Sequence, residues 1–492
     1  RSFLLLDESM LPFLLAQPGS RLATWFSIAL PFTHSEPYDA SAGYVPAEMF
    51  YGRATELESV RMQGGCYFIY GGRQLGKTAL LRRAEKTFHD PMAERYAVWI
   101  DLLAQGIGER RRVSEVWLAI FEKLRDLKIV GLEMPTVNPA KPASVDAFLG
   151  AIESFLAAKA GRRILLLLDE ADRFFEQDGR QESGYAETRR LKQLMDETER
   201  RFKVVFAGLH NVLRTVSTSN QPLGHFNEAV RIGPLMDERE IRAAEELITR
   251  PIEAAGFEFE DRSLVMRVLA QTNYYPSLIQ LYCTQLLRHL RENRLRRRDV
   301  AGPRFNIEEA DIESVFSGRP LRDAIRAKFR LTLQLDDRYE VIANAIGLEA
   351  LSTGFDHTEG IEWRQIRNDC ATLWWPEGFA STSERDFLAL LEEMVQLGVL
   401  SQASVPDHFS LRNPNVLLLL GSKQEIENTL QAEREPRVEF ESTIFRPALA
   451  GCMDQPARNP LSYRQLDEVM QLRSSVLLVA ATDAAGSKHL LS

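Results

Sequence analysis

A glycine-rich segment near residue 75 carries residue types that bind phosphate. It fits the pattern G-x-x-x-x-G-K-[ST] and consists of Gly71, Gly72, Arg73, Gln74, Leu75, Gly76, Lys77 and Thr78, followed by Ala79. Glycines let the backbone turn so that successive N–H groups point at phosphate oxygens, and the positive end of the following helix faces the same anion. Lys77 would contact the β- and γ-phosphates while the Thr78 hydroxyl ligates Mg²⁺. The segment therefore predicts a site for ATP and Mg²⁺.

Two carboxylates follow a short, strongly apolar segment. Residues 164–168 are five consecutive aliphatic residues, typical of a strand buried on both faces, and Asp169 and Glu170 come directly after them. The carboxyl end of such a strand is where ligands bind in open α/β sheets. Asp169 is the expected Mg²⁺ ligand, and Glu170 is the expected base toward the attacking water. A solvated acidic turn is the alternative interpretation, and Asp172 has no expected role.

Strands and helices must alternate to position these residues. We expect strands at 66–70, 96–102, 164–168, 202–209 and 230–232, with helices after residue 76 and at 113–127 and 145–159. Alternation of this kind predicts a parallel sheet with helices on both faces, here an α/β P-loop NTPase core.

The domain boundaries follow from changes in this pattern. We expect an N-terminal extension, the ATPase core, a helical lid domain, a winged-helix domain and the start of a further, incomplete α/β domain, at 1–48, 49–236, 237–318, 319–432 and 433–492. Asp237 should cap the first lid helix, with Glu240 completing a capping box. A helix at 386–397, Gly398 and two strands after it are typical of a winged helix.

Residues just before the phosphate loop resemble a family motif. Phe50 to Leu57 is similar to the F-x-G-R-x-x-E-L box of the STAND and origin-recognition-type AAA+ ATPases. In those proteins the box covers the adenine, so the resemblance implies Tyr51, Gly52 and Arg53 as adenine contacts. It also implies that the α/β core is of the ASCE/AAA+ type.

Two later segments resemble further elements of that family. The end of the strand at 202–209 is similar to sensor 1, which implies Asn211 or His210 as the polar residue near the γ-phosphate. Tyr274 to Pro276 resembles the G-x-P element, whose proline packs on adenine, although Tyr274 stands where glycine is usual. The helix that starts there has no arginine at the sensor 2 position, and this favours the STAND branch over a ring-forming motor.

Composition limits the classes of partner. The 492 residues carry a formal net charge of −9, so the total charge gives no reason to expect a nucleic acid or a membrane. The cysteines form no CxxC pair, which argues against a zinc site and fits a reducing cytoplasm; they are Cys66, Cys283, Cys370 and Cys452. Because the chain begins at Arg1 and stops within a pattern, we expect a fragment of a longer cytoplasmic protein.

Local charge leaves the question of nucleic acid open. Seven arginines are basic enough to touch nucleic acid, with a solvated stretch as the alternative: Arg288, Arg291, Arg294, Arg296, Arg297, Arg298 and Arg304. The helix at 386–397 instead presents acidic or amide residues, unfavourable beside phosphate, on its expected outer face: Asp386, Glu392, Glu393 and Gln396. We therefore expect this domain to contact protein rather than DNA, with Arg412 helping it to close over the nucleotide. Arg231 could act as an arginine finger or form a surface salt bridge.

Three functions remain open at this stage. The preferred one, implied by the resemblance, is an ATP-binding and ATP-hydrolysing STAND-type switch in bacterial signalling or antiphage defence. It would form a homo-oligomer on activation or act through a partner effector protein. The alternative is a DNA-binding AAA+ ATPase of the initiator or transposition-regulator type. A scaffold that binds ATP with negligible turnover is the third.

Overall fold

The structure is a computed structural model of the chain. It describes residues 7–16, 21–22, 24–25, 32, 36–38, 45–181, 184–209, 229–293, 305–353 and 359–432. The chain divides into two compact units, residues 1–431 and 432–492. The domain predicted from residue 433 onward lies outside the described residues.

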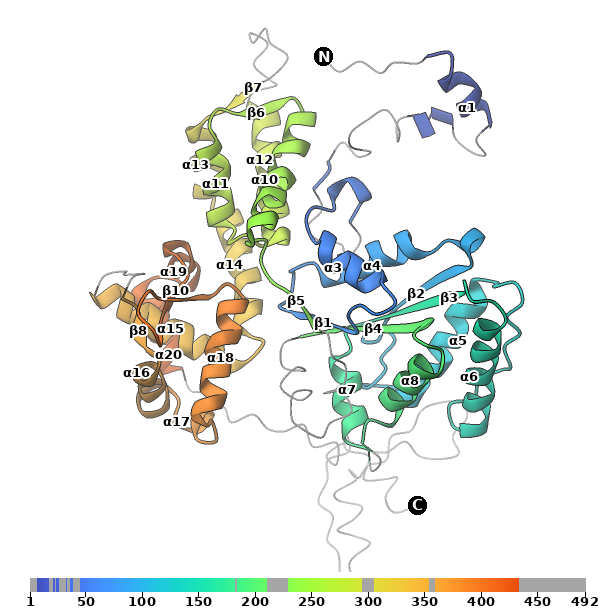
Figure 1. Ribbon diagram of the computed structural model, residues 1–492. Coiled ribbons are helices and arrows are strands. Elements are labelled where there is room, and N and C mark those ends of the chain that lie inside the picture. The colour runs from blue at the N-terminus through green and yellow to red at the C-terminus, as the bar shows by residue number, and fades with distance from the viewer. Residues whose placement is uncertain are drawn as a thin grey trace, which may run out of the picture. The chain divides into compact units, whose positions relative to one another are not determined.

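A five-stranded parallel sheet forms the centre of the predicted ATPase core (Figure 1). Its strands are β1 (Phe68–Gly71), β2 (Arg95–Asp101), β3 (Arg163–Asp169), β4 (Phe202–Gly208) and β5 (Ala229–Ile232). They lie in the order β2-β3-β4-β1-β5, and every pairing is parallel. All five carboxyl ends therefore meet at one edge of the sheet.

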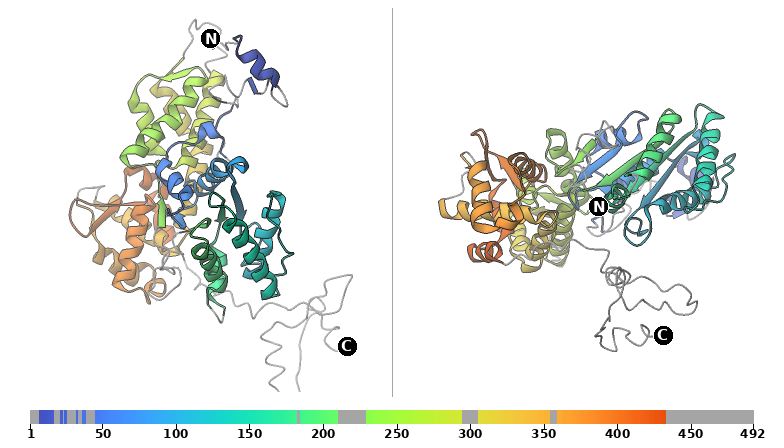
Figure 2. Two further views of the ribbon diagram at one scale, coloured as in Figure 1. Left: turned by 45° about the vertical axis from the view of Figure 1, so that its right-hand side comes forward. Right: turned by 90° about the horizontal axis from the view of Figure 1, so that it is seen from below.

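Helices cover both faces of this sheet (Figure 2). The helices of the core are α3 (Ala54–Arg61), α4 (Lys77–Phe88), α5 (Val116–Asp126), α6 (Pro142–Ala157), α7 (Asp172–Gly179) and α8 (Ala186–Glu197), with 3-10 turns at Ala47–Met49, Pro91–Ala93 and Val113–Glu115. Along β3, Leu165 and Leu167 pack into one hydrophobic core while Leu166 and Leu168 pack into the other. This alternation explains why the strand is aliphatic at every position.

Four helices and a short strand pair form the next part of the chain. The helices are α10 (Glu238–Ala254), α11 (Arg262–Gln271), α12 (Pro276–Asn293) and α13 (Glu309–Ser317), and β6 (Phe257–Phe259) pairs with β7 (Phe305–Ile307). Pro251 lies inside α10 and has no N–H to give to Leu247. The Tyr38 hydroxyl donates to the carbonyl oxygens of Leu247 and Ile248, at 3.1 and 2.8 Å, and so packs part of the N-terminal segment on this helix.

Only half of the capping box predicted at the start of α10 forms. The Glu240 carboxylate accepts a backbone hydrogen bond from Asp237, but the Asp237 side chain makes no capping hydrogen bond. The Glu240 carboxylate also pairs with the Arg53 guanidinium, which donates to the carbonyl oxygen of Gly233 as well. A long-range contact with a cation is therefore added to the local one.

The remaining helices surround a second, antiparallel sheet. The elements are α14 (Arg319–Leu333), α15 (Asp337–Thr353), β8 (Ile361–Glu362), α16 (Trp363–Asp369), a π-helical turn (Cys370–Trp374), α17 (Pro376–Phe379), α18 (Glu384–Gln396), β9 (Leu400–Gln402), β10 (His408–Leu411), α19 (Pro414–Leu420) and α20 (Lys423–Gln431). The sheet has the order β8-β10-β9. The predicted helix and hairpin around Gly398 are both present, but Glu393 is half-buried and accepts a hydrogen bond from Tyr339, so it does not belong to an outer face.

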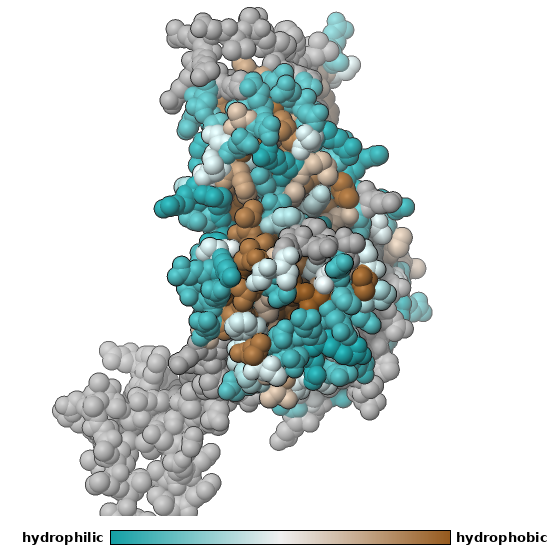
Figure 3. All heavy atoms as spheres, turned by 90° about the vertical axis from the view of Figure 1, so that its left-hand side faces the viewer, coloured by the Kyte–Doolittle hydropathy of each residue, from teal (hydrophilic) through white to brown (hydrophobic). Residues whose placement is uncertain are grey.

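Outside these elements, α1 (Met10–Ala16) is the first described helix. On the face drawn in Figure 3, hydrophobic side chains form a broken band between hydrophilic ones. None of the described helices is both long enough and apolar enough to cross a bilayer. Cys66, Cys283 and Cys370 are buried and form no disulfide with any described residue, and Cys452 lies outside the described residues.

Candidate nucleotide site

Strand order brings the predicted site residues to one edge. β4 lies between β1, which leads into the phosphate loop, and β3, which leads into Asp169 and Glu170. The end of β4 is therefore flanked by the loop on one side and the two carboxylates on the other. In open α/β sheets this is the edge where ligands bind.

The phosphate loop has the backbone that its glycines predict. Gly76 has a φ of 97° and precedes α4, which begins at Lys77. A φ in this region strains any residue with a Cβ, so glycine is required there. Gln74 also has a positive φ, of 64°. Within the loop, Leu75 is buried and Arg73 is exposed. Thr78 and Ala79 lie in the first turn of α4, where they contribute backbone N–H groups.

Lys77 is buried at the centre of this arrangement. Its ammonium donates to the carbonyl oxygens of Gly71 and Gly72, at 3.0 and 2.8 Å. Burial lowers the pKa of Lys77, while Glu170, Asp172 and Asp169 raise it. The lysine is therefore close to three carboxylates, and its ammonium lies where a phosphate would bind.

Asp169 and Thr78 supply the oxygen atoms expected for a metal ion. Oδ1 of Asp169 accepts the N–H of Glu170 at 3.0 Å, and Oδ2 is buried without a hydrogen-bond partner in the described part of the chain. Burial raises the pKa of Asp169, and hydrogen bonding with Thr78 lowers it. An unpaired buried carboxylate oxygen beside a hydroxyl is the hard oxygen donor set that Mg²⁺ prefers, so these residues fit the ion.

Glu170 stands in a strained position beside Lys77. Its φ is 51°, an uncommon value for a residue with a side chain, and such strain concentrates at functional sites. Burial raises the pKa of Glu170, and Lys77 opposes that shift. A raised pKa makes a carboxylate a better proton acceptor near neutral pH, as a general base requires.

Asp172 is a site residue that the sequence analysis left without a role. Its carboxylate accepts the N–H of Leu209 at the end of β4, at 2.9 Å, and it is close enough to Lys77 to raise the lysine pKa. The strand order is what identifies Asp172 as a site residue, because only the placement of β4 beside β3 brings Leu209 to Asp172. No spacing in the sequence reports that order.

The residues implied for adenine stand in different settings. Arg53 has a φ of 60°, caps α3 and is buried in its contacts with Glu240 and Gly233. Tyr51 and Gly52 precede it, and Pro276 is the first residue of α12. The Ser277 hydroxyl donates to Oε1 of Gln74 at 3.3 Å, so the start of α12 contacts the phosphate loop. Adenine contact by these residues stays a prediction, and the sensor candidates His210 and Asn211 lie outside the described residues.

The comparisons with known proteins agree with this core. Residues 60–216 match the family model described as AAA domain. Together with the strand order, this match confirms the predicted P-loop AAA+ fold of the core. No curated protein matches the chain.

Solved structures similar to this chain share little sequence with it. The Walker-type ATPase PABY2304 of Pyrococcus abyssi is 17% identical, with a TM-score of 0.49 over 77% of this chain and 97% of that one. The ORC2 protein of Aeropyrum pernix, in ADPNP-ADP complexes, is 14% identical, with a TM-score of 0.48 over 80% and 97%. The ORC1 protein of Aeropyrum pernix, in complex with DNA, is 15% identical, with a TM-score of 0.33 over 78% and 94%.

Proposed function

We propose that this chain is an ATP-binding and ATP-hydrolysing AAA+ switch, in which residues 319–432 form a winged helix that closes on the phosphate loop. One observation supports the nucleotide site most strongly. The buried Lys77 ammonium faces Asp169 and Glu170 at the edge where β1, β3 and β4 end. A buried ammonium needs anionic or polar partners, and a triphosphate could replace the Gly71 and Gly72 carbonyls as the partner of Lys77 while Mg²⁺ offsets the nearby carboxylates.

The residues take distinct roles in this proposal. The loop N–H groups and Lys77 bind and orient the phosphates, and Glu170 accepts the proton of the attacking water. Thr78 and Asp169 would hold Mg²⁺, which supplies charge neutralisation on the phosphates when it is bound. Because Glu170 and Lys77 lie on opposite sides of the end of β4, the water and the phosphate can be held in line.

Contacts at the end of α18 support the switch. A Cβ placed on Gly72 would lie 2.7 Å from Cδ2 of Leu397, so this leucine sits directly on the phosphate loop. The Tyr275 hydroxyl donates to the Leu397 carbonyl, and Nδ2 of Asn273 donates to the Gly398 carbonyl at 2.8 Å. Residues 397–398 therefore contact the loop and the start of α12 at the same time. Movement of the loop on nucleotide binding must reach α18 through these contacts.

Arg412 adds a charged contact at the same junction. Its guanidinium lies 5.5 Å from the ring centroid of Tyr274 and contacts the sulfur of Met236. Burial lowers the pKa of Arg412. The half-buried cation is thus held by a ring face and a thioether, which is weaker than an ion pair and suited to a contact that opens.

Titration of ATP into the Lys77→Ala variant tests the nucleotide site. Wild type should bind ATP in calorimetry and release phosphate with Mg²⁺, and the variant should lose about a hundredfold or more in affinity, since a charge-assisted contact to phosphate is removed. Lys86→Ala, a lysine at the other end of α4, is the matched control and should bind as wild type does. Full affinity in the Lys77 variant would overturn the proposal.

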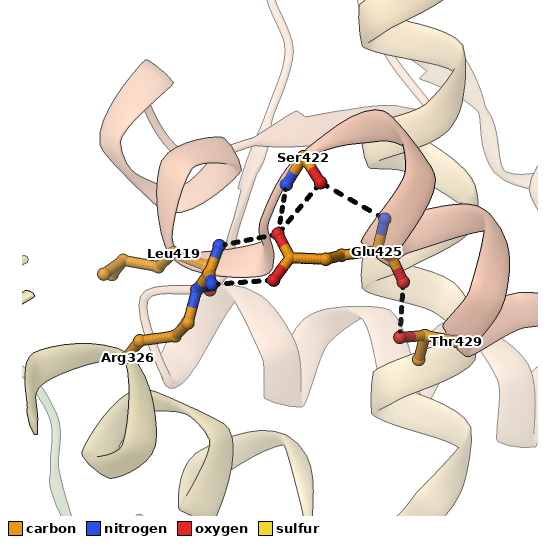
Figure 4. Close-up of polar contacts among 5 residues, drawn as sticks. All are labelled: Arg326, Leu419, Ser422, Glu425 and Thr429. Carbon is orange, nitrogen blue, oxygen red and sulfur yellow. Dashed lines mark hydrogen bonds and ion pairs between the residues drawn. The ribbon is translucent and has the colours of Figure 1, made fainter. Parts of the chain in front are cut away.

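The initiator-type role is a second candidate because α14 carries an arginine stripe, defined as Arg319, Arg322, Arg326 and Arg330. Their spacing of three, four and four residues places them on one helix face over about 16 Å. Arg326 is bidentate to Glu425, at 3.0 and 3.2 Å (Figure 4). The other three arginines are exposed and make no ion pair with any described residue.

The stripe fits a phosphate backbone better than a lipid surface. Guanidinium groups match phosphate oxygens in a planar fork, and α14 buries its apolar face within the protein, at Leu321, Ile325, Phe329 and Leu333. A membrane-surface helix would expose such residues beside the basic ones. The large hydrophobic side chains exposed in the described part of the chain include none from α14.

Binding of labelled duplex DNA across a salt series separates the two roles. If the stripe contacts phosphates, changing Arg319, Arg322 and Arg330 to Gln should reduce the slope of log K against log salt by about 2.7. Changing Arg110, Arg125 and Arg180 to Gln removes the same charge from exposed positions elsewhere and should leave the slope unchanged. If neither triple variant changes the salt slope, and ATP instead raises the mass of the protein in solution, the STAND-type role is favoured.

A further inference from the structure

Asp172 joins two strand ends that flank the proposed nucleotide site. It is the first residue of α7 and follows Glu170 after one buried residue, Ala171. Its Oδ1 accepts the N–H of Leu209 at 2.9 Å, and Ala171 donates its own N–H to the carbonyl oxygen of Ala207 at 2.9 Å. Two hydrogen bonds therefore tie the turn after β3 to the end of β4.

The end of β4 is paired with β1 as far as Gly208, but its pairing with β3 provides no such tie at this point. Regular pairing of β3 with β4 ends at Leu168 and Phe206, before either strand reaches the site. Beyond that register the separation of the two strand ends depends on the bonds made by Ala171 and Asp172. Only one of the two uses a side chain, so it is the one that substitution can remove.

The surroundings of Asp172 fit a specific contact. A Cβ placed on Gly208 would lie 3.4 Å from both carboxylate oxygens, so the carboxylate packs closely against the end of β4. Oδ2 is buried and has no hydrogen-bond partner among the described residues. Burial raises the pKa of Asp172, and the N–H of Leu209 lowers it. The Asp172 carboxylate therefore loses water on burial and makes a hydrogen bond to Leu209 in return. An aspartate on the surface would not lose its hydration in this way.

We propose that Asp172 is a positioning residue for ATP hydrolysis, holding the carboxyl end of β4, and the phosphate loop that β1 carries beside it, at a fixed distance from Glu170. This inference rests on the ATPase function proposed above. A displacement of about 1 Å between reacting groups costs roughly a hundredfold in rate. Because the bond to Leu209 acts on geometry and does not touch the nucleotide, its loss should lower kcat and spare nucleotide affinity.

Two substitutions separate the hydrogen bond from the charge. Asp172→Ala removes both, whereas Asp172→Asn keeps an oxygen that accepts the Leu209 N–H. We expect Asp172→Ala to lower kcat by about ten- to a hundredfold with an ATP Kd within about threefold of wild type. Asp172→Asn should regain most of that loss. Thermal unfolding of each variant shows how much of the protein is folded.

Asp178→Ala is the matched control, because Asp178 is a buried carboxylate with a structural contact. It accepts the N–H groups of Glu187 and Thr188, at 3.2 and 2.8 Å, at the start of α8. Its loss should lower the melting temperature and leave kcat per folded molecule unchanged. The same result in Asp172→Ala, or an equally slow Asp172→Asn, would overturn the positioning role.

Wild-type turnover measured in the same assay separates two failures. If wild type binds ATP without turnover, the hydrolytic function fails and the role of Asp172 fails with it. If wild type turns over and Asp172→Ala is as fast, only the role of Asp172 fails.

Discussion

The Tyr275 hydroxyl, in the first turn of the α12 region, donates a hydrogen bond to the carbonyl oxygen of Leu397 at the end of α18. Both residues are buried, and the side chain of Leu397 lies on Gly72 of the phosphate loop. With the bond from Asn273 to the Gly398 carbonyl, this hydrogen bond joins the predicted lid to the proposed winged helix beside the phosphate loop. The next prediction depends on it.

Tyr275→Phe should loosen this junction and speed the release of nucleotide. The change leaves a buried carbonyl without its donor, at a cost of about 1–3 kcal/mol in the closed form. We expect fluorescent ADP to dissociate about tenfold faster in stopped-flow measurements, which corresponds to about 1.4 kcal/mol.

Tyr282→Phe is the control for that experiment. The Tyr282 hydroxyl donates to the carbonyl of Ile312 at 3.1 Å, within the predicted lid. It should lower the melting temperature by a comparable amount and leave ADP release unchanged. Equal release rates in the two variants would show that the Tyr275 bond does not couple α18 to the nucleotide.

Much of the core followed from sequence because its signals are local. The phosphate loop has a fixed spacing, and the strand ending at Asp169 is buried on both faces, so its aliphatic pattern identifies it. The register of neighbouring strands and the order β2-β3-β4-β1-β5 depend on pairings between distant segments, which no local pattern encodes. The role of Asp172 was hidden for that reason.

The capping-box prediction was half right. Asp237 and Glu240 have the right spacing, and Glu240 makes its half of the box, but the Asp237 side chain does not make the other half. Arg53, far away in sequence, is buried against Glu240 and adds a contact that no local pattern predicts. The resemblance implies an adenine contact for Arg53, and that role stays a prediction. The contact that the structure gives Arg53 is the one with Glu240 of α10.

Arg53→Met should destabilise the protein by about 3–5 kcal/mol, because it leaves the Glu240 carboxylate buried without its cation. Adding Glu240→Leu should recover part of that loss, since an apolar pair no longer buries a lone charge. Urea unfolding measures both. If Glu240→Leu on the Arg53→Met background costs further stability, the pair is not coupled as proposed.

The stability loss in Arg53→Met should depend on pH. Burial raises the pKa of Glu240, and the Arg53 cation opposes that shift, so removing the cation raises the pKa further. A carboxyl whose folded-state pKa is raised destabilises the fold when it is ionised, and this contribution fades as pH falls. The gap between wild type and variant should therefore be smaller at pH 5 than at pH 8. A gap that is constant with pH would mean that the protonation state of Glu240 does not change over this range, and the proposed pH dependence would be wrong.

The hydrogen bonds of Glu425 lead us to expect an acid-sensitive contact between α14 and the α19–α20 turn. The N–H and hydroxyl of Ser422 and the Arg326 guanidinium lower the pKa of Glu425 to about 2 (Figure 4). A lowered pKa gives stability that is present above the unfolded value and is lost as pH falls from about 4.5 toward 2. The carboxylate is 45% exposed, so solvent screening limits the gain to about 1 kcal/mol or less.

Thermal unfolding of Glu425→Gln checks this contact. The variant should melt below wild type at pH 6, and the two melting temperatures should converge below pH 3. Glu427→Gln, a surface glutamate on α20 at 4.0 Å from Lys423, should melt with wild type throughout. A difference for Glu425→Gln that persists at pH 2 would have to come from packing, not from the charge.

Glu170→Gln should separate ATP binding from hydrolysis. Glutamine keeps the shape of the side chain but cannot accept the proton of the attacking water, so kcat should fall by about a hundredfold or more. ATP affinity should stay within about threefold, because Lys77 and the loop N–H groups are untouched. Glu176→Gln, on the neighbouring helix α7 with a partly exposed carboxylate, is the control and should hydrolyse ATP as wild type does. If wild type and Glu170→Gln release phosphate equally slowly, catalysis is not the task of this site, and the chain acts through ATP binding alone.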